Sequence, residues 1–321
     1  MIELLLCTLI WGASFIAQKL GADHFGPFAI NCYRNLLAGV FLLLCLKVRD
    51  RRLRALRAEC PQPSEQTPNC SIEQSEQSEQ SNNSRSELLG GALSGLCVFA
   101  AEVAQQVGIE STVPGVSAFL TANYVLLVPV FGIFLGRRAG WGVWSGVALA
   151  LVGTYLICFP TSEIPHSSFL IPQSLGTGES WTLLCAALFA VQILVVDRFA
   201  PGSDMLRFSL VQMSVAGLVA LPFVFLPGEV ARASWAGFVK GIPALIWLGI
   251  ISSGIAYTLQ NLGQKKVPAA LASIVMSLEG VFAAIFGWLI LGDVLTVRQL
   301  LGCGLVFSAV ILSQLISLRR S

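Results

Sequence analysis

Polar side chains that lie inside long apolar stretches are the residues of this sequence best suited to chemistry. Three triplets of them have offsets of 0, 3 and 4, a spacing that places the members of each triplet on one helical face. The triplets are Asn31, Arg34 and Asn35; Glu102, Gln105 and Gln106; and Tyr257, Gln260 and Asn261. Such groups need partners or water, because a charge at the centre of a bilayer costs about 2.5 to 3.5 kcal/mol. We expect them to line a pathway; the alternative is that they join helices by hydrogen bonds.

A shift of 155 residues superposes the second triplet on the third. If the two halves of the chain cross a membrane in opposite senses, Glu102 falls toward the outside and Tyr257 toward the cytoplasm. The two triplets would then form a polar vestibule at each end of one pathway.

Arg34 and Glu102 are expected to form an ion pair. Each lies seven residues from the outer end of its apolar stretch, a distance of roughly 10 Å along a helix. The pair would act as an external gate or an anion-sensing site, or it would be a purely structural salt bridge.

Glu279 lies near the middle of the apolar stretch 267–291. An apolar setting disfavours the ionised form of a carboxyl group and so favours a bound proton. Glu279 is therefore the candidate for proton coupling. The alternative is a neutral, hydrogen-bonded packing residue.

Two weaker stripes of polar and aromatic residues also have helical spacing and could line a cavity. They are Trp11, Ser14 and Gln18, and Ser117, Thr121 and Tyr124. The sequence has no phosphate-binding glycine loop, metal-ligand cluster or nucleophile elbow. We therefore predict no enzymatic activity, no cofactor and no metal, and we do not expect nucleic acid as a partner.

The elements that must position these residues are membrane helices. Of the 321 residues 55% are hydrophobic and 12% charged, and the mean hydropathy is +0.75, more apolar surface than a soluble core of this size could bury. A spanning helix needs about 20 apolar residues. The sequence predicts ten, at about 2–22, 27–48, 88–109, 113–136, 141–159, 180–200, 204–226, 240–261, 267–291 and 297–316. The fold class is an all-α integral membrane protein.

The ten stretches divide into two similar units, at 1–159 and 180–316. A shift of 178 residues places Trp11 on Phe189 and Arg34 on Gln212, and the stretch that begins at Val113-Pro114 matches the one that begins at Val267-Pro268. Five spans per unit is an odd number, so the units must be inverted relative to each other. The polar segment 58–87, with its Ser-Glu-Gln repeats, is expected to be a disordered cytoplasmic linker within the first unit.

The distribution of basic residues sets the orientation. Fifteen of the twenty Lys and Arg residues fall on the side that carries the N-terminus, and four fall on the other side. Because basic residues accumulate in cytoplasmic loops, both termini are predicted to be cytoplasmic.

Several short motifs are spread along nearly the whole chain. They are Ile10-Trp11-Gly12-Ala13-Ser14-Phe15, Gly26-Pro27 to Arg34, Ala118-Phe119-Leu120-Thr121 with Val128-Pro129, Ser277-Leu278-Glu279-Gly280-Val281-Phe282, and Gly287-Trp288-Leu289-Ile290-Leu291-Gly292-Asp293. Together they resemble the EamA-type transporters of the drug/metabolite transporter superfamily. Glu279 matches the Glu of the family's Leu-Glu-Pro pattern; Gly280 stands where proline is usual, and Asp293 where Glu is usual.

The resemblance implies a five-plus-five inverted fold with a central cavity that moves small metabolites, often amino acids or their derivatives, and commonly outward. We therefore expect a multi-pass secondary transporter of a bacterial inner membrane that works by alternating access. Its expected partners are a small-molecule substrate, the lipid bilayer and a coupled proton; a homodimer is left open. The alternatives are a lipid-linked substrate flippase, a membrane sensor that signals through the linker, and an intramembrane enzyme.

Overall fold

The computed structural model describes residues 1–59, 70–111, 114–137, 140–158, 176–291 and 296–318. Within these ranges the regular elements are helices. In the first half they are α1 (Ile2–Ala22), α2 (Pro27–Glu59), α3 (Cys70–Ser111), α4 (Pro114–Ala122), α5 (Tyr124–Phe134) and α6 (Trp141–Cys158). In the second half they are α7 (Thr177–Phe199), α8 (Met205–Ala220), the 3-10 helix η2 (Leu221–Phe225), α9 (Pro227–Arg232), α10 (Trp235–Ile246), the π-helix η3 (Trp247–Ala256), α11 (Tyr257–Gln264), α12 (Ala269–Met276), α13 (Leu278–Phe286), the π-helix η4 (Gly287–Leu291) and α14 (Val297–Leu318).

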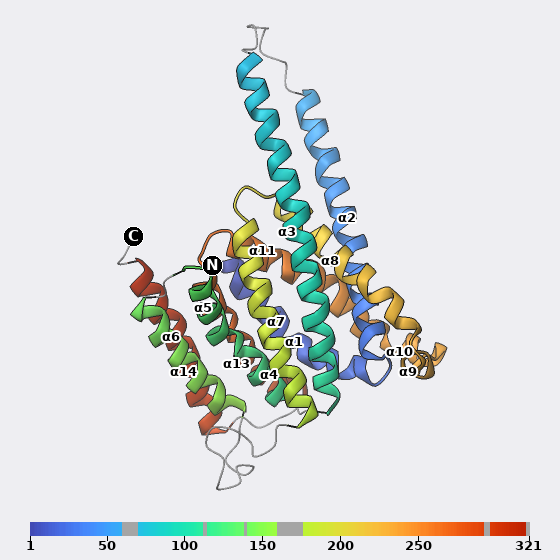
Figure 1. Ribbon diagram of the computed structural model, residues 1–321. Coiled ribbons are helices and arrows are strands. Elements are labelled where there is room, and N and C mark those ends of the chain that lie inside the picture. The colour runs from blue at the N-terminus through green and yellow to red at the C-terminus, as the bar shows by residue number, and fades with distance from the viewer. Residues whose placement is uncertain (60–69, 112–113, 138–139, 159–175, 292–295, 319–321) are drawn as a thin grey trace.

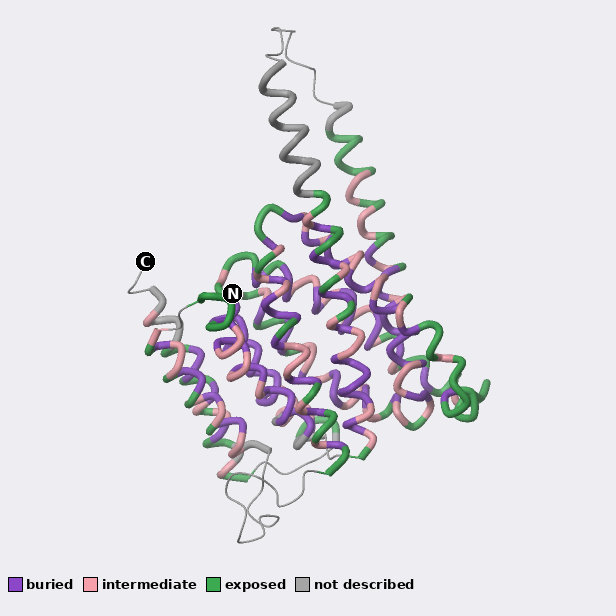
Figure 2. Tube along the Cα trace, in the orientation of Figure 1, coloured by how far each residue is buried: buried purple, intermediate pink, exposed green. Residues whose placement is uncertain are grey.

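The helices have the length and composition of membrane spans. Seven helical stretches of the described chain are long and apolar enough to cross a bilayer, and three shorter apolar helices lie at Leu120–Phe134, Trp141–Leu156 and Leu300–Leu312. Many large apolar side chains are exposed while polar ones are buried, and buried residues concentrate along the inner faces of the bundle (Figure 2). This inside-out distribution is that of an all-α membrane protein.

The bundle packs around α1. This helix contacts α13 on one side and η3 on another, while α3 lies against α7 and α8, and α6 against α14. The approach of α1 to α13 is close at Gly12, where a Cβ atom would come within 2.5 Å of the Phe282 Cβ. Only glycine fits there, so Gly12 brings the α1 residues next to Glu279 on α13.

The second and third helices project well beyond the rest of the bundle as an antiparallel pair (Figure 1). The N-terminal residue and the C-terminal end of α14 lie toward the same end of the molecule. The structure differs here from the disorder expected of 58–87, because α2 continues to Glu59 and α3 begins at Cys70; residues 60–69 lie outside the described ones. Glu and Gln are good helix formers, which accounts for the helix in so polar a segment.

Two of the expected spans depart from a regular helix at a single residue. Asn123 lies between α4 and α5, and Ser277 lies between α12 and α13; both keep helical backbone angles. The Asn123 amide donates to the Leu120 carbonyl at 3.2 Å and the Ser277 hydroxyl to the Ile274 carbonyl at 2.7 Å. Such short-range bonds compete with the helical ladder for backbone acceptors. The ninth span nevertheless continues past Ser277 to Glu279 and beyond.

Candidate functional site

A cavity lies among α1, α2, α3, α4, α5, α7, η3, α11, α12 and α13. The space not occupied by protein atoms there, counted together with the part open to solvent, is about 460 Å³. Its walls combine aromatic rings with buried polar side chains. The lining residues are Trp11, Ser14, Phe15, Gln18, Arg34, Glu102, Gln105, Thr121, Tyr124, Phe189, Gln192, Ile193, Ser252, Tyr257, Gln260, Met276 and Glu279.

Most of the candidate residues named from the sequence meet at this cavity. Those that line it are Trp11, Ser14, Gln18, Arg34, Glu102, Gln105, Thr121, Tyr124, Tyr257, Gln260 and Glu279. Five others do not: Asn31, Asn35, Gln106, Ser117 and Asn261. The Asn31 amide bonds the Pro27 carbonyl, the Gln106 amide bonds the Gln18 carbonyl, and Asn261 bonds Ser209 and Gln212. These three side chains join helices or helical turns outside the cavity wall.

Arg34 and Glu102 form the ion pair expected of them, with 3.2 Å between the Arg34 Nη2 and Glu102 Oε1 atoms. Both side chains are almost fully buried, with 4% and 1% of their surfaces exposed. Arg34 also donates to the Ser253 hydroxyl at 2.9 Å and to the Ser252 hydroxyl at 3.3 Å. A charged pair at such depth is tolerated only when further hydrogen bonds satisfy both ions. The two serines, both on η3, supply those bonds to the guanidinium.

Glu102 is satisfied from two other helices. The Asn35 amide donates to its Oε2 atom at 2.7 Å and the Tyr257 hydroxyl to its Oε1 atom at 3.1 Å. Glu102 and Tyr257 therefore lie at the same depth, which corrects the expectation that they occupy opposite ends of the pathway. The next polar residues of the two helices have separate partners: Gln105 bonds Thr121, and Gln260 bonds Gln192.

Glu279 lies in an apolar part of the cavity wall. Among the described residues its side-chain partner is Tyr124, whose hydroxyl donates to the Glu279 Oε1 atom at 3.0 Å. Buried apolar residues, among them Met276 and Val281, pack around the two side chains. This carboxyl group thus has one donor where Glu102 has three, a guanidinium, an amide and a hydroxyl.

Aromatic side chains form much of the remaining wall. The rings of Trp11 and Tyr257 meet edge to face, with 5.0 Å between their centroids, and Phe15, Tyr124 and Phe189 also line the space. Trp247 is held beside the wall by a bond from its indole N–H to the Ser14 hydroxyl at 3.1 Å. Buried indole and phenol groups find such partners when a polar group is within reach.

The sequence reasoning missed Phe15, Phe189, Gln192, Ile193, Ser252 and Met276 as lining residues. A signal for three of them existed. The shift of 178 residues carries Trp11, Ser14 and Phe15 onto Phe189, Gln192 and Ile193, and all six line the cavity. Ser252 had no such signal, because it faces the cavity from a π-helix whose wider turns change which residues share a face.

A buried polar network continues from Gln192 away from the cavity. The amides of Gln192 and Gln212 both donate to the Ser94 hydroxyl, at 3.2 and 2.9 Å, and the Asn261 amide donates to the Gln212 Oε1 atom at 2.8 Å. Gln192 and Gln260 bond each other. The network ties α3, α7, α8 and α11 together by side-chain bonds inside the bundle.

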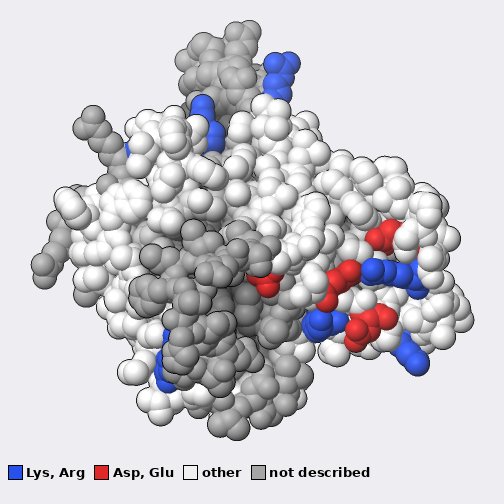
Figure 3. Space-filling model, turned by 60° about the horizontal axis from the view of Figure 1, so that its bottom comes forward, with Lys and Arg blue, Asp and Glu red and all other residues white. Residues whose placement is uncertain are grey.

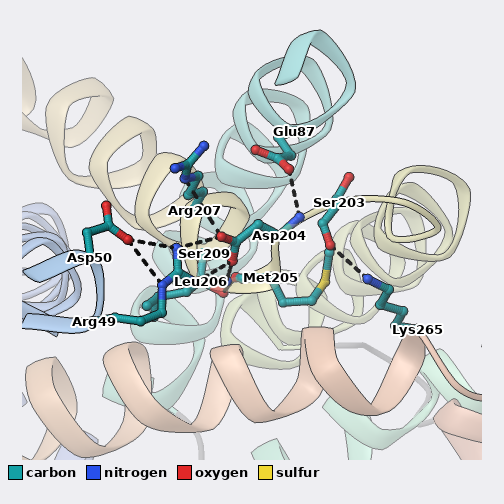
Figure 4. A network of polar contacts seen from close by, with 10 residues as sticks. All are labelled: Arg49, Asp50, Glu87, Ser203, Asp204, Met205, Leu206, Arg207, Ser209 and Lys265. Carbon is teal, nitrogen blue, oxygen red and sulfur yellow. Dashed lines mark hydrogen bonds and ion pairs between the residues drawn. The ribbon is translucent and has the colours of Figure 1, made fainter. Parts of the chain in front are cut away.

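A second polar cluster lies where α8 begins (Figure 4). Arg49 on α2 donates to both carboxylate oxygens of Asp204, at 3.0 and 2.7 Å, and the Asp204 backbone N–H donates to Glu87 on α3 at 2.7 Å. Asp204 also caps α8 by accepting from the Leu206 N–H. Burial alone would raise the pKa of Asp204, but the bonds and charge of Arg49 and the backbone donors outweigh it and hold that pKa below its usual range.

Most of the described surface on the face turned forward in Figure 3 is uncharged. Its Asp and Glu side chains gather with several Lys and Arg mainly toward the right of the view, while other Lys and Arg side chains lie at the top and the lower left. Among the described residues no group of three or more His, Cys, Asp or Glu side chains could hold a metal ion. The chemistry of the cavity is therefore that of its two carboxyl groups, one guanidinium, amides, hydroxyls and rings.

Comparison with known proteins identifies the group to which this chain belongs. The profile of the EamA-like transporter family matches residues 1–65 and 176–315. The chain belongs to the EamA-like transporter family. It is thereby an EamA-type transporter of the drug/metabolite transporter superfamily, a multi-pass membrane protein that moves small molecules.

Named relatives and a solved structure are similar to this chain. An uncharacterised transporter of Archaeoglobus fulgidus is 26% identical over 318 residues, covering 97% of this chain and 84% of the relative. The uncharacterised inner membrane transporter YedA of Escherichia coli is 24% identical, with 95% and 87% covered. The threonine/homoserine exporter RhtA of Escherichia coli is 27% identical over 199 residues, 62% of each chain. A crystal structure matches 98% of each chain at a TM-score of 0.64 and 16% identity, a likeness of fold alone.

Proposed function

We propose that this EamA-type protein is a secondary transporter that exports a small metabolite, such as an amino acid or a derivative, through the central cavity by alternating access. We further propose ten membrane spans in a five-plus-five inverted repeat, with both termini in the cytoplasm. Glu279 carries the coupling proton, and the other cavity residues named from the sequence form the substrate pathway.

One observation carries the proposal: the cavity lining consists mostly of pairs of repeat-equivalent residues. A shift of 178 relates three of these pairs and a shift of 155 relates four, and these seven pairs supply fourteen of the seventeen lining residues. The pairs are Trp11 and Phe189, Ser14 and Gln192, Phe15 and Ile193, Glu102 and Tyr257, Gln105 and Gln260, Thr121 and Met276, and Tyr124 and Glu279. For the last two the shift agrees within one residue with that between Val113-Pro114 and Val267-Pro268.

Pairs of this kind accumulate where two inverted units share a pseudo-two-fold axis. A residue near such an axis lies close to its own equivalent, so a cavity on the axis is lined by both members of each pair. In two of the pairs, Glu102 with Tyr257 and Tyr124 with Glu279, the two members are also joined to each other by a hydrogen bond. Transporters built from inverted repeats bind substrate at this place and open to either side by exchanging the conformations of the two units.

Substrate class and direction are inferred from the relatives and the cavity together. The curated name of RhtA records export of threonine and homoserine, which are small and zwitterionic. The cavity offers hydroxyl, amide and charged groups that suit a polar solute, and rings that suit an apolar side chain. An amino acid or a derivative of one fits both halves of this description.

Two measurements test the proposal. Metabolites inside and outside cells with and without the protein are compared, and a solute that changes is then followed in vesicles that contain the purified protein. We expect the solute to be depleted in the medium of cells that lack the protein, and to cross vesicle membranes only when the protein is present. If no solute differs between the cells and none crosses the vesicle membrane, the protein is not a transporter of metabolites, and a sensor or enzyme becomes the better reading.

A further inference from the structure

When Glu279 has released its proton, the charges of the cavity do not balance. One arginine and two glutamates line it. Arg34 and Glu102 neutralise each other at 3.2 Å, which leaves the carboxylate of Glu279 without a basic partner among the described residues. A solute of complementary charge is a partner that such a buried group can gain in place of the proton.

Arg34 is poorly placed to receive an anion from the solute. Its side chain already holds Glu102 and the hydroxyls of Ser252 and Ser253. These bonds use the Nε and Nη2 atoms, and a carboxylate that approached the Nη1 atom would stand beside Glu102, which already neutralises the guanidinium. The charge of the one guanidinium of the cavity is thus balanced within the protein.

Glu279 is placed in the opposite way. Tyr124 bonds one of its oxygens, and its side chain contributes to the cavity surface. The second oxygen, Oε2, has no protein donor among the described residues, although the group belongs to the lining. A charged donor from a solute would complete its hydrogen bonds and supply the missing positive charge.

The rings around Glu279 favour the same kind of solute. Trp11, Tyr124 and Tyr257 line the cavity with Phe15 and Phe189, and the faces of aromatic rings attract cations, most strongly those of Trp. A carboxylate set among aromatic walls therefore suits an ammonium group and repels an anion.

We propose that the cavity selects solutes by a protonated amino group, held by the Glu279 carboxylate and the aromatic walls, and that a carboxylate on the solute is not required. The inference rests on the proposed transport function and narrows its substrate class to ammonium-bearing solutes, zwitterions among them. It assigns to Arg34 no direct contact with the solute.

Three probes that share a phenyl ring on a two-carbon chain test the contribution of each charged group separately. Phenylalanine carries both the ammonium and the carboxylate, phenethylamine carries the ammonium alone, and 3-phenylpropanoate carries the carboxylate alone. Binding to the purified protein in detergent is measured by calorimetry and by the fluorescence of Trp11, with Trp11→Phe to identify its signal. We expect phenethylamine to bind at least as tightly as phenylalanine, and 3-phenylpropanoate to bind roughly tenfold more weakly or not at all. Equal or tighter binding of 3-phenylpropanoate overturns the inference, as does failure of both ammonium probes to bind.

Variants locate the ammonium site. Glu279→Gln should weaken phenethylamine binding by roughly tenfold to a hundredfold, and Glu279→Asp by less, because the charge remains. Glu179→Gln neutralises a carboxyl group in the first turn of α7, away from the lining, and should leave binding unchanged. Unaltered binding by a folded Glu279→Gln protein overturns the assignment; if that variant does not fold, Glu279→Asp and the three probes on the unaltered protein decide it.

Transport of the metabolite found by the cell comparison is measured separately in vesicles. Should that transport occur while 3-phenylpropanoate binds best, the proposed function stands and the substrate class is wrong. Should no solute move in vesicles, the proposed function fails whatever the probes bind.

Discussion

At the scale of residues, the buried ion pair is the most completely satisfied group of the cavity. Arg34 and Glu102 are joined to Asn35, Tyr257, Ser252 and Ser253, so the charges are supported from four helical segments, α2, α3, η3 and α11. Breaking a buried pair by removing one partner is strongly destabilising because it leaves an uncompensated charge. The pair therefore controls folding as well as any gating role.

Glu102→Gln should lower the stability of the protein by about 3 to 5 kcal/mol, because Arg34 loses its counter-ion in a site that excludes water. The thermal midpoint in detergent and the activity in vesicles measure the effect. The matched control is Glu110→Gln, which removes a carboxylate from the exposed pair with Arg232 and should cost less than about 1 kcal/mol.

The exchange of both charges, Arg34→Glu with Glu102→Arg, should recover only part of the loss. Asn35 and Tyr257 are placed to donate to a carboxylate at position 102, and the two serines to accept from a guanidinium at position 34. A stable and active Glu102→Gln protein would show that the ion pair is required neither for stability nor for transport.

Glu279→Gln should separate proton coupling from transport itself. The amide keeps the shape and the bond to Tyr124 but cannot release a proton. At substrate concentrations high enough to offset the weaker binding expected of this variant, exchange of substrate down its gradient should therefore survive, while accumulation driven by a pH gradient should not. Vesicles with and without an imposed pH gradient measure the two modes, with Glu179→Gln as the control. If the variant accumulates substrate in response to the gradient as well as the unaltered protein does, Glu279 does not carry the proton. Proton coupling then depends on Glu102 or is absent.

At the scale of elements, the start of α8 is the point where α2, α3 and α8 are joined outside the cavity (Figure 4). Asp204 caps α8 and accepts hydrogen bonds from both terminal nitrogens of the Arg49 guanidinium. The Asp204 backbone N–H donates to the Glu87 carboxylate. Lys265, just after α11, donates to the Ser203 carbonyl beside it. One aspartate thus helps to position three helices relative to one another.

Asp204→Ala should lower stability by about 0.5 to 2 kcal/mol for the lost cap alone, and by more once the Arg49 bonds are included. The pKa of Asp204 is held below its usual range, so its contribution is present above the unfolded value of about 3.9 and is lost as pH falls through the lower folded value. The difference from the unaltered protein should accordingly be constant near neutral pH and shrink in acid.

Chemical denaturation in detergent at several pH values measures this difference. Asp50→Ala is the control, because Asp50 touches Arg49 at 3.4 Å without capping a helix. An Asp204→Ala effect as small as that of Asp50→Ala, or one that grows in acid, would contradict the role given to the cluster.

At the scale of the whole molecule, the α2–α3 extension, the N-terminal residue and the C-terminal end of α14 lie toward one end of the bundle (Figure 1). The second half of α2 carries Lys47, Arg49, Arg51, Arg52 and Arg54. Cytoplasmic loops carry an excess of basic residues, so the arrangement agrees with the proposed cytoplasmic location of this end.

Single cysteines in a background without the nine native ones should react according to this topology. A membrane-impermeant reagent added to intact cells should label a cysteine placed in 160–178, because that loop is expected outside, and should label one placed in 58–87 only after the cells are opened. Labelling of both positions in opened cells is the control. Reaction of the linker position from outside intact cells would reverse the topology.

Much of the fold class and of the site could be read from the sequence. Trp11, Glu102 and Glu279 were found because a polar or aromatic group at helical spacing is conspicuous inside a membrane-length apolar segment, where it needs a partner. The internal repeat also held the information for Phe189 and Gln192, as the equivalents of Trp11 and Ser14. These are local and periodic properties, and a sequence records them directly.

The tertiary structure decided how these residues meet. Offsets of 0, 3 and 4 define a broad face, so Gln105 lines the cavity while Gln106 beside it bonds the backbone of α1. Glu102 and Tyr257 meet at one depth, although the inversion of the two halves was expected to separate them. The depth at which residues of different helices meet depends on the tilt and packing of helices far apart in the chain, and spacing along one helix carries no information about it.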